Sequence, residues 1–490
     1  MWHRRMLPFV FSLVLLTILL SIGCQGTGPF ALQNTPTVAA KGAGVDLTVY
    51  NQNVALVKDK RTLAFKSGMN EVRFTDVAAQ IDPTSVQFTS LTDPSGTRVV
   101  EQNYAYDIVG SQKILQKYLD QNVSLVTEDG TKYSGKLLSG ADDIILQGDD
   151  GQVTSVKLAR VRELKFPQLP GGLITKPTLI WLVNSSRDGN QDAQVTYLTN
   201  GINWKANYVA VINANDTAMN LNGWVTIDNQ SGARYEDANL KLVAGDVRRV
   251  TPVPAAREGA LPAAAPTAAP AAQFVEQSFF EYHLYTLQRP TTIQNRETKQ
   301  IEFTSAANVP VNKLFVYDGA SGLRFYGYQI TDPSYGKTSN TKVAVMIEFK
   351  NSEQNRLGIP LPKGTIRVYK ADSDGGNQFV GEDNIDHTAK DETIRLNIGN
   401  AFDVVGERKQ TNFNKIADRV IEESYQIKVR NHKTEAVEVR VVEHLFRWSN
   451  WQITQSNQDY SKLDAQTIEF RVKVAPDGEG TANYTVRYSW

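Results

Sequence analysis

Cysteine is almost absent from this sequence: Cys24 is the only one in 490 residues. A single thiol excludes internal disulfides, so the folded body must be stabilised by burial of its core. An excess of charge of either sign is also lacking, because 52 Lys and Arg residues face 52 Asp and Glu residues. A chain without a strong positive field, and without a basic stretch interleaved with stacking aromatics, is not expected to bind nucleic acid.

Motifs for local metal, phosphate and nucleophile sites are lacking as well. Of the four histidines after the N-terminal segment (His283, His387, His432 and His444), no two have the His-x-x-x-His or His-x-His spacing of a metal site. Residues 319–322 fall short of the Gly-x-Ser-x-Gly elbow, and no phosphate-binding Gly-x-x-x-x-Gly loop with a following Lys-Ser or Lys-Thr is found. We therefore expect no catalytic residue, no metal ligand and no cofactor.

The N-terminus has the pattern of a secretion signal. Residues 3–5 are positively charged, and Leu7 to Ile22 is an apolar stretch that is short for a bilayer span of roughly 20 residues. The stretch ends at Leu20-Ser21-Ile22-Gly23-Cys24, which resembles the lipobox of bacterial lipoproteins, with Ser21 in place of the usual Leu. We predict a signal peptide over residues 1–23 and lipidation of Cys24. The alternatives are an ordinary cleaved signal or an uncleaved anchor with an incidental cysteine.

Residues 24–44 are rich in Gly, Thr, Pro, Ala and Gln, which predicts a flexible tether between the lipid and the folded body. Gln25, rather than Asp, follows the cysteine, which resembles the default sorting to an outer membrane where the organism has one. We therefore expect an exported protein that is attached to a membrane of the bacterial cell envelope through its N-terminal lipid.

Alternation of apolar and polar residues with period two dominates the rest of the chain and predicts half-buried strands. Val45 to Tyr50, Trp204 to Ile212 and Tyr484 to Trp490 are clear examples. We expect an all-β, multi-domain fold of antiparallel β-sandwiches. Its parts are a β-rich region over 45–110, a sandwich over 171–250 and a C-terminal sandwich over 274–490.

Residues 111–170 predict a small inserted unit within this β pattern. Lys113 to Leu119 is its best helical segment, and five short strands follow, joined by turns such as Glu128-Asp129-Gly130 and Asp149-Asp150-Gly151. Five short strands with such turns are typical of an SH3-like or Sm-like barrel. Barrels of this kind often bind a ligand, but the fold alone does not set the function.

Ala and Pro dominate residues 251–273, where five prolines occur. Such a segment has little apolar side chain to bury, which predicts a disordered or extended linker. The alternative is a surface loop inside one domain, because the strands on its two sides could pair across it.

Several longer motifs resemble one family. They are Phe280 to Thr292 with Glu297 to Gln300, Lys363 to Lys370, Gly381 to Ile385, and Trp224 with Asn229 to Gly232 and Leu242 to Val247. Together they resemble bacterial proteins that carry the domain of unknown function 4139. The resemblance covers most of the chain after the signal and is strongest from about Leu173 onward. That family has no agreed reaction, so the resemblance implies no catalytic residues.

The first of these motifs contains the candidate binding residues Tyr282, His283 and Tyr285. On a strand, Tyr282 would share a face with Leu284, and His283 would share the other face with Tyr285. A functional site around His283 is one interpretation of this aromatic motif. The other is a histidine that packs and forms a hydrogen bond.

Residues 372–377, Asp-Ser-Asp-Gly-Gly-Asn, resemble a calcium-binding loop only in part. Gly376 stands where a coordinating Asp or Asn is needed, and Asn377 stands in place of the turn glycine. Between Val368 and Phe379 we therefore expect an ordinary hairpin turn.

These features favour a membrane-anchored envelope lipoprotein that acts as a non-catalytic binding or structural β module. Its partner would be an envelope protein, a peptide or a glycan. One alternative is a hydrolase of an envelope polymer whose site forms only in three dimensions. The other is a metal-binding envelope protein.

Overall fold

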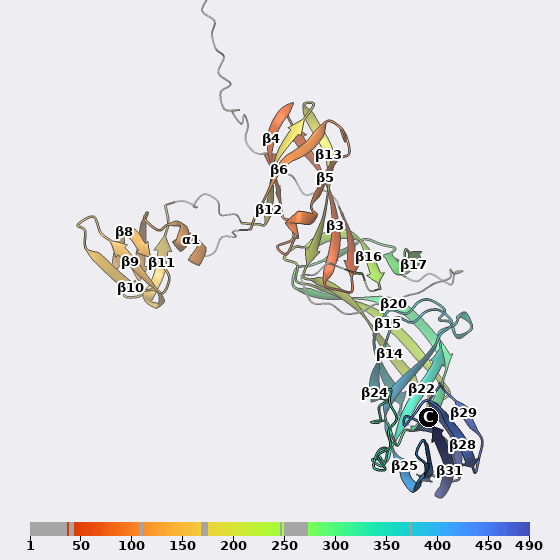
Figure 1. Ribbon diagram of the computed structural model, residues 1–490. Helices are drawn as coiled ribbons and strands as arrows, with labels where there is room; N and C mark the ends of the chain where they lie inside the picture. Colours follow the sequence, from red (N-terminus) through yellow and green to blue (C-terminus); the bar gives the residue numbers. More distant parts are fainter. Residues whose placement is uncertain are drawn as a thin grey trace, which may run out of the picture.

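The structure is a computed structural model, and it describes residues 37–38, 44–106, 111–167, 175–245, 247–248, 273–372 and 374–490. Cys24, the predicted signal peptide and all of the Ala/Pro-rich segment except Gln273 lie outside these ranges. The described chain is nearly all β, as the sequence predicts, and its strands form five sheets (Figure 1). Within these ranges, none of the helices has the length and apolar character needed to cross a membrane.

Two sheets make up one end of the molecule. The first has the order β1-β4-β12-β6, and the second has the order β17-β18-β16-β2-β3-β13-β5, with β19 paired to β16. Because β2 to β6 come from residues 45–105 and β12, β13 and β16 from residues 178–244, these two stretches of sequence fold together.

The strands of the first sheet are β1 (Thr37–Val38), β4 (Gly68–Thr75), β12 (Thr178–Ser185) and β6 (Thr97–Ala105). Those of the second are β17 (Phe274–Phe279), β18 (Tyr282–Leu287), β16 (Tyr235–Ala244), β2 (Val45–Tyr50), β3 (Val54–Phe65), β13 (Gly189–Asn200), β5 (Gln87–Ser90) and β19 (Thr291–Ile293). A short 3-10 helix, η1 (Pro83–Ser85), precedes β5. Alternate residues of β2 are buried, which agrees with the period-two pattern of its sequence.

The predicted inserted unit forms a five-stranded sheet with the order β10-β9-β8-β7-β11. Its elements are α1 (Ser111–Lys117), β7 (Asn122–Thr127), β8 (Lys132–Ser139), β9 (Asp143–Gln147), β10 (Val153–Lys157), η2 (Leu158–Arg160) and β11 (Val161–Lys165). The last strand pairs with the first, and β10 and β11 stand at the two ends, so the sheet is open in its backbone pairing. A core of its own, with Leu115, Leu137 and Ile144, lets this unit stand apart from β6 and β12 (Figure 1).

A five-stranded sheet with the order β20-β15-β14-β23-β24 follows. Its strands are β20 (Glu297–Pro310), β15 (Ala218–Asn229), β14 (Ile202–Ile212), β23 (Gly364–Ala371) and β24 (Asn377–Ile385). Residue 371 pairs with residue 377 across the β23–β24 hairpin, so the segment that partly resembles a calcium loop is a hairpin turn, as predicted; Ser373 lies outside the described residues. Since β15 pairs with β20 and β16 with β18, strands on both sides of the Ala/Pro-rich segment share sheets.

The last sheet has nine strands, in the order β28-β31-β26-β25-β22-β21-β27-β30-β29. They are β28 (Trp451–Ser456), β31 (Gly478–Ser489), β26 (Val420–Asn431), β25 (Thr393–Ala417), β22 (Lys342–Lys350), β21 (Asn312–Tyr317), β27 (Val437–His444), β30 (Thr467–Val474) and β29 (Tyr460–Lys462). The 3-10 helix η3 (Glu353–Asn355) follows β22.

Strands β22 and β25 each serve two hydrophobic cores. Ile347 and Leu396 belong to the large core, which the first two sheets share with the sheet β20-β15-β14-β23-β24, whereas Val343 and Val404 belong to the core of the nine-stranded sheet. Between these two parts the pairing shifts, from Ala344 with Asn400 to Lys342 with Val405, so β25 bulges at residues 401–404. The bulge therefore marks the boundary between the two cores.

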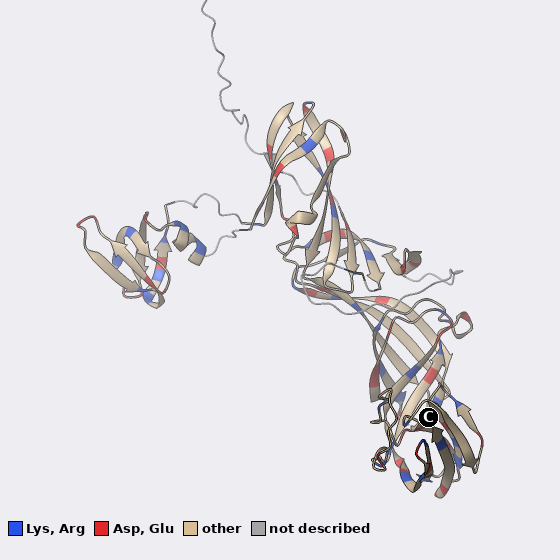
Figure 2. Cartoon of the chain, in the orientation of Figure 1, with Lys and Arg blue, Asp and Glu red and all other residues tan. Residues whose placement is uncertain are grey.

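The sequence predicts antiparallel sandwiches, and four of the described strand pairs are parallel instead: β1–β4, β2–β16, β14–β23 and β21–β27. Parallel pairing needs a long connection, which these sequence-distant strands have. Charges of both signs are interspersed over every part of the molecule (Figure 2), as the balanced composition implies.

Candidate functional site

The motif around His283 lies in the hairpin of β17 and β18. His283 Nδ1 is 2.8 Å from Oε1 of Glu276 on the neighbouring strand, and the histidine side chain is partly exposed. Tyr285 is buried, and its hydroxyl donates to the carbonyl of Pro360 at 2.9 Å. Tyr282 packs against Gly245, where a Cβ atom would meet its ring at 2.4 Å. The three candidates thus lie on one strand, with Tyr285 in the core and His283 in hydrogen-bond contact with Glu276.

The remaining histidines are dispersed. His387 is near Asn51 and Lys363, and His444 Nε2 lies 2.9 Å from Oδ2 of Asp318. Within the ranges that the structure describes, no three His, Cys, Asp or Glu side chains are grouped so that they could hold a metal ion.

Two ion pairs are fully buried in the core of the nine-stranded sheet. Arg408 of β25 has its Nε 2.9 Å from Oε2 of Glu443 on β27, with side-chain exposures of 1% and 0%. Arg447 has its Nε 2.7 Å from Oε2 of Glu423 on β26, and both side chains are 2% exposed. We call these four residues the arginine clamp.

Neutral side chains satisfy the carboxylates of the clamp. The Tyr484 hydroxyl donates to Glu443 at 2.6 Å. Gln410 and the Tyr425 hydroxyl donate to Glu423 at 2.6 and 3.0 Å. The Arg408 guanidinium lies 3.9 Å from the centre of the Tyr425 ring, so cation–π attraction adds to the pairing.

Burial of these charges is expensive. Taking an ion out of water costs several kcal/mol, and a buried pair is often no more stabilising than apolar residues of the same volume. Burial alone would lower the pKa of Arg408, but the charge and hydrogen bond of Glu443, together with Tyr484 and Tyr425, outweigh it, so the pKa of Arg408 is raised and the guanidinium stays charged. The retention of two such pairs calls for an explanation beyond core stability.

The other guanidinium nitrogens of the clamp hold a long loop. Arg447 donates through Nη1 to the carbonyls of Ile330 at 2.9 Å and Asp332 at 2.8 Å, and through Nη2 to that of Tyr335 at 3.0 Å. Arg408 Nη1 donates to the carbonyl of Gly336. These carbonyls belong to residues 318–341, which join β21 to β22 without forming a helix or strand. A structureless segment of this length in a compact domain is usually functional.

This segment, which we call the aromatic loop, presents three large side chains to solvent. Phe325, Tyr326 and Tyr328 are 40%, 55% and 60% exposed. The rings of Tyr326 and Tyr328 lie 5.8 Å apart at an angle of 33°, and Phe325 lies 6.3 Å from Phe446. Gly327 between the tyrosines has a φ of 78°, a conformation that favours glycine. The result is a set of exposed aromatic faces on a loop whose backbone is held by the arginine clamp at residues 330–336.

His444 ties the start of the aromatic loop to the sheet. Its ring stacks on Phe446 at 4.8 Å, and its Nε2 pairs with Asp318, the first residue of the loop. The hydrogen bond with Asp318 raises the pKa of His444, so the histidine is more readily protonated than a free one. Protonation at this position therefore favours the contact between loop and sheet.

Sequence reasoning missed both the clamp and the loop, although each left a signal. Glu423 is in phase with buried Ile421 and Tyr425 on β26, a charged residue at a core position. Glu443 stands likewise in phase with buried Val441 on β27. A charge in the apolar register of a strand predicts a buried partner. The sequence could not name that partner, because it comes from a distant segment of the chain.

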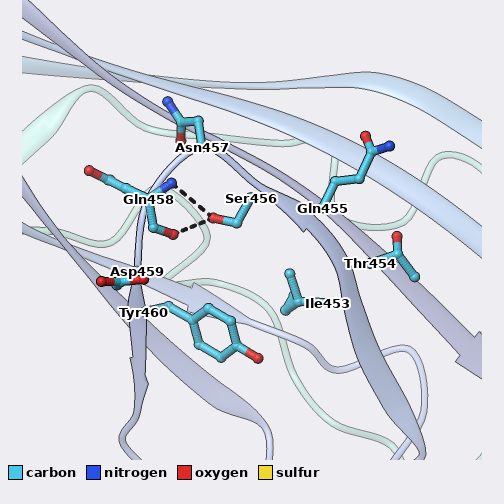
Figure 3. A pocket seen from close by; sticks show the side chains of 8 residues that line it. All are labelled: Ile453, Thr454, Gln455, Ser456, Asn457, Gln458, Asp459 and Tyr460. Atoms are coloured by element: carbon cyan, nitrogen blue, oxygen red, sulfur yellow. Dashed lines mark hydrogen bonds between the residues drawn. The ribbon is translucent and has the colours of Figure 1, made fainter.

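Residues 453–460, between β28 and β29, line a hollow of about 460 Å³ (Figure 3). Its lining is mostly polar, and Ser456 Oγ accepts from the Gln458 amide nitrogen and donates to the Gln458 carbonyl. All eight lining residues are consecutive, so this hollow brings no distant groups together. The clamped aromatic loop is the stronger candidate.

Comparison with known proteins gives the family of the chain. No curated protein matches the sequence. Residues 193–490 match the family model described as Domain of unknown function (DUF4139), a range that includes His283, the arginine clamp and the aromatic loop. The match covers more than half of the 490 residues, and the chain therefore belongs to the DUF4139 family.

Proposed function

We propose that this protein is a lipid-anchored protein of the bacterial cell envelope that binds a glycan through its aromatic loop, without catalysing a reaction. The observation that carries the binding role is the arginine clamp: two buried ion pairs whose remaining donors fix the backbone of one exposed aromatic segment. A binding surface that is rigid beforehand loses little conformational entropy when the ligand arrives.

The exposed rings favour a glycan over the other partners expected for such a module. Sugar rings have apolar C–H faces that pack on aromatic faces, and the neighbouring tyrosines offer two faces 33° from parallel. Tyrosine also adds a hydroxyl that can form hydrogen bonds with sugar hydroxyls, at a low entropy cost because it has few rotatable bonds. The hydrolase and metal-binding alternatives stay hypotheses that this proposal does not require.

The envelope location rests on the N-terminal sequence. The lipobox-like segment before Cys24, the uniqueness of that cysteine and the tether after it agree with one another. If Cys24 is lipidated, cells fed labelled palmitate will incorporate the label into the wild-type protein and not into Cys24→Ser. Equal labelling of both proteins would refute the anchor.

The binding role is tested by co-sedimentation of the purified protein with insoluble cell-wall glycan. Replacing Phe325, Tyr326 and Tyr328 together by serine removes three aromatic contacts of about 1 kcal/mol each, so we expect binding to weaken roughly 100-fold. The melting temperature should not change, since these side chains are exposed.

A matched control is Phe279→Ser with Phe280→Ser, which removes two exposed rings from the β17–β18 hairpin. This variant should bind as the wild type does. Unchanged sedimentation of the aromatic-loop variant, or equal losses in both variants, would contradict the proposal.

A further inference from the structure

A separate cavity of about 180 Å³ lies where the five-stranded sheet meets the nine-stranded sheet. Residues of β14, β21, β22, β23, β24 and β25 line it, so it gathers groups that are far apart in the sequence. We call it the junction pocket. It shares no residue with the aromatic loop, so the two sites can be tested independently.

The floor of the junction pocket is apolar. Phe315 and Ile347 are buried at its base, Phe315 in the core of the nine-stranded sheet and Ile347 in the large core. Val345 and Ile398 add partly buried aliphatic surface. The pocket thus lies on the boundary between the two cores, where neither core covers the surface completely.

Lysines form the rim. Lys313 Nζ lies 2.8 Å from Oδ2 of Asp216, and Lys370 Nζ pairs with the other oxygen of the same carboxylate. Burial raises the pKa of Asp216, but the hydrogen bonds and charges of the two lysines outweigh it, so the net pKa is lowered and the carboxylate is ionised. Two ammonium groups therefore share one carboxylate.

A third lysine, Lys433, completes the rim. Its Nζ lies 6.0 Å from the centre of the Phe315 ring and 3.8 Å from an exposed carboxylate, that of Glu435. Exposed Asp403 is the second carboxylate of the lining, and together with Asp216 and Glu435 it balances the charges of the three lysines. Each ammonium group has three N–H donors, so donors remain for a ligand carboxylate beyond the bond that each lysine makes to an acid.

Phe402 stands at the edge of the pocket on the bulge of β25. It is 94% exposed, the most exposed large apolar side chain described in the molecule. A bulge redirects a side chain out of the regular strand pattern, and here it carries a phenyl ring into solvent beside an apolar floor. An exposed phenyl next to an apolar cavity offers a ligand apolar area on two sides.

We propose that the junction pocket binds the C-terminal residue of a polypeptide that ends in an apolar side chain, with the terminal carboxylate at the lysines and the side chain between Phe315 and Phe402. Charge-assisted hydrogen bonds from ammonium groups recognise a carboxylate, and the apolar floor selects what is attached to it. The volume favours this occupant, because 180 Å³ is below the roughly 300–1,000 Å³ of pockets that enclose larger ligands and suits a single residue.

The test uses the purified full-chain protein and a fluorescein-labelled tetrapeptide that ends in leucine. Fluorescence polarisation should show saturable binding of the free acid, and at least about tenfold weaker binding of the same peptide with a C-terminal amide, which lacks the charge. Raising the salt concentration should weaken the binding of the acid more than that of the amide.

Two surface variants distinguish the contacts of the terminal carboxylate from those of the apolar side chain. Lys433→Gln should weaken binding of the acid and leave the amide unchanged, and Phe402→Ser should weaken both. Lys409→Gln removes an exposed lysine elsewhere on β25 and should bind as the wild type does. Unchanged melting temperatures will show that all three variants fold.

The proposal is overturned if acid and amide bind equally, if neither binds, or if Lys409→Gln loses as much affinity as Lys433→Gln. It is also overturned if octanoate displaces the peptide at equal concentration, because the pocket would then select an acyl chain rather than a peptide end.

Discussion

Two regions of the molecule bury an arginine against a carboxylate, and they use the pair in different ways. In the large core, Arg61 and Asp59 are two residues apart on β3, with Nη2 and Oδ2 2.7 Å apart. Arg61 also donates to the carbonyl of Thr75 at 2.9 Å and lies 3.7 Å from the centre of the Phe74 ring. This pair is local to one strand and its neighbour.

The arginine clamp joins distant parts of the chain instead. Arg408 and Glu443 are 35 residues apart, and the Gly336 carbonyl that Arg408 reaches is 72 residues away. A buried arginine–carboxylate pair can therefore stabilise adjacent strands in one region and hold a distant loop in another. What distinguishes the two is where the spare guanidinium nitrogens point.

The largest expected effect is that of breaking the clamp on one side. Arg408→Ala leaves Glu443 charged and buried without its cationic partner, which should lower the free energy of unfolding by about 3–5 kcal/mol. Urea denaturation followed by circular dichroism measures this loss. A loss below about 1 kcal/mol would mean that water reaches Glu443 and that the clamp is not a buried pair.

The sharper test removes both charges of one buried ion pair in each region. Arg408→Met with Glu443→Leu and Tyr484→Phe leaves no buried charge or hydroxyl unpaired at that pair, so most of the stability should return apart from the cost of the Gly336 carbonyl, which loses its donor. The aromatic loop nevertheless loses its contact at Gly336 and should open more often. Trypsin cleavage after the exposed residues Arg324 and Lys337 measures this opening.

The matched control for that test is Asp59→Leu with Arg61→Met in the large core. It should leave cleavage at Arg324 and Lys337 at the wild-type rate, because Arg61 contacts Asp59, Thr75 and Phe74, which all lie far from the aromatic loop in the sequence. Equal acceleration of tryptic cleavage in both variants would show that the two buried pairs do not differ in their effect on the aromatic loop.

The smallest effect concerns pH, and only the C-terminal region should show it. The pKa of His444 is raised above 6.5 by its hydrogen bond with Asp318, so its contribution to stability is fully present below pH 6.5 and is lost as the pH rises through the folded-state pKa. Tryptic cleavage of the loop should therefore accelerate above pH 6.5, after correction for the activity of trypsin. His444→Gln should remove this pH dependence, and a variant that keeps it would exclude His444 as the cause.

The sequence predicted strands better than sites, for a physical reason. Period-two alternation depends on neighbouring residues, so β2 and the turn at residue 375 could be read locally. The arginine clamp depends on which strands lie side by side, and the parallel pairing of β21 with β27 is not encoded by any local pattern. Glu423 was visible as a charge in an apolar register, but its partner Arg447 follows β27 and could not be assigned.

The motif at His283 also shows what the sequence cannot predict, namely whether an aromatic side chain is buried or exposed. The density of aromatic residues indicated Tyr282, His283 and Tyr285 as candidate binding residues, yet the ring of Tyr285 contributes to the large core. The aromatic loop has a similar density in residues 325–328, and its importance comes from exposure, which only tertiary structure decides. Composition alone does not distinguish a buried ring from a presented one.

The short strand β1 limits the distance between Cys24 and the folded part of the protein. Thr37 and Val38 pair with Val72 and Arg73 of β4, so the chain is fastened only 13 residues after Cys24. With Cys24 lipidated as proposed, a fully extended leash of that length spans at most about 45 Å, against about 70 Å if it ran free to residue 44. In Figure 1, β4 lies at one end and the nine-stranded sheet at the other. If Cys24 is lipidated as proposed, the two backbone pairings of β1 would hold the β4 end of the protein within that distance of the bilayer, with the nine-stranded sheet at the far end.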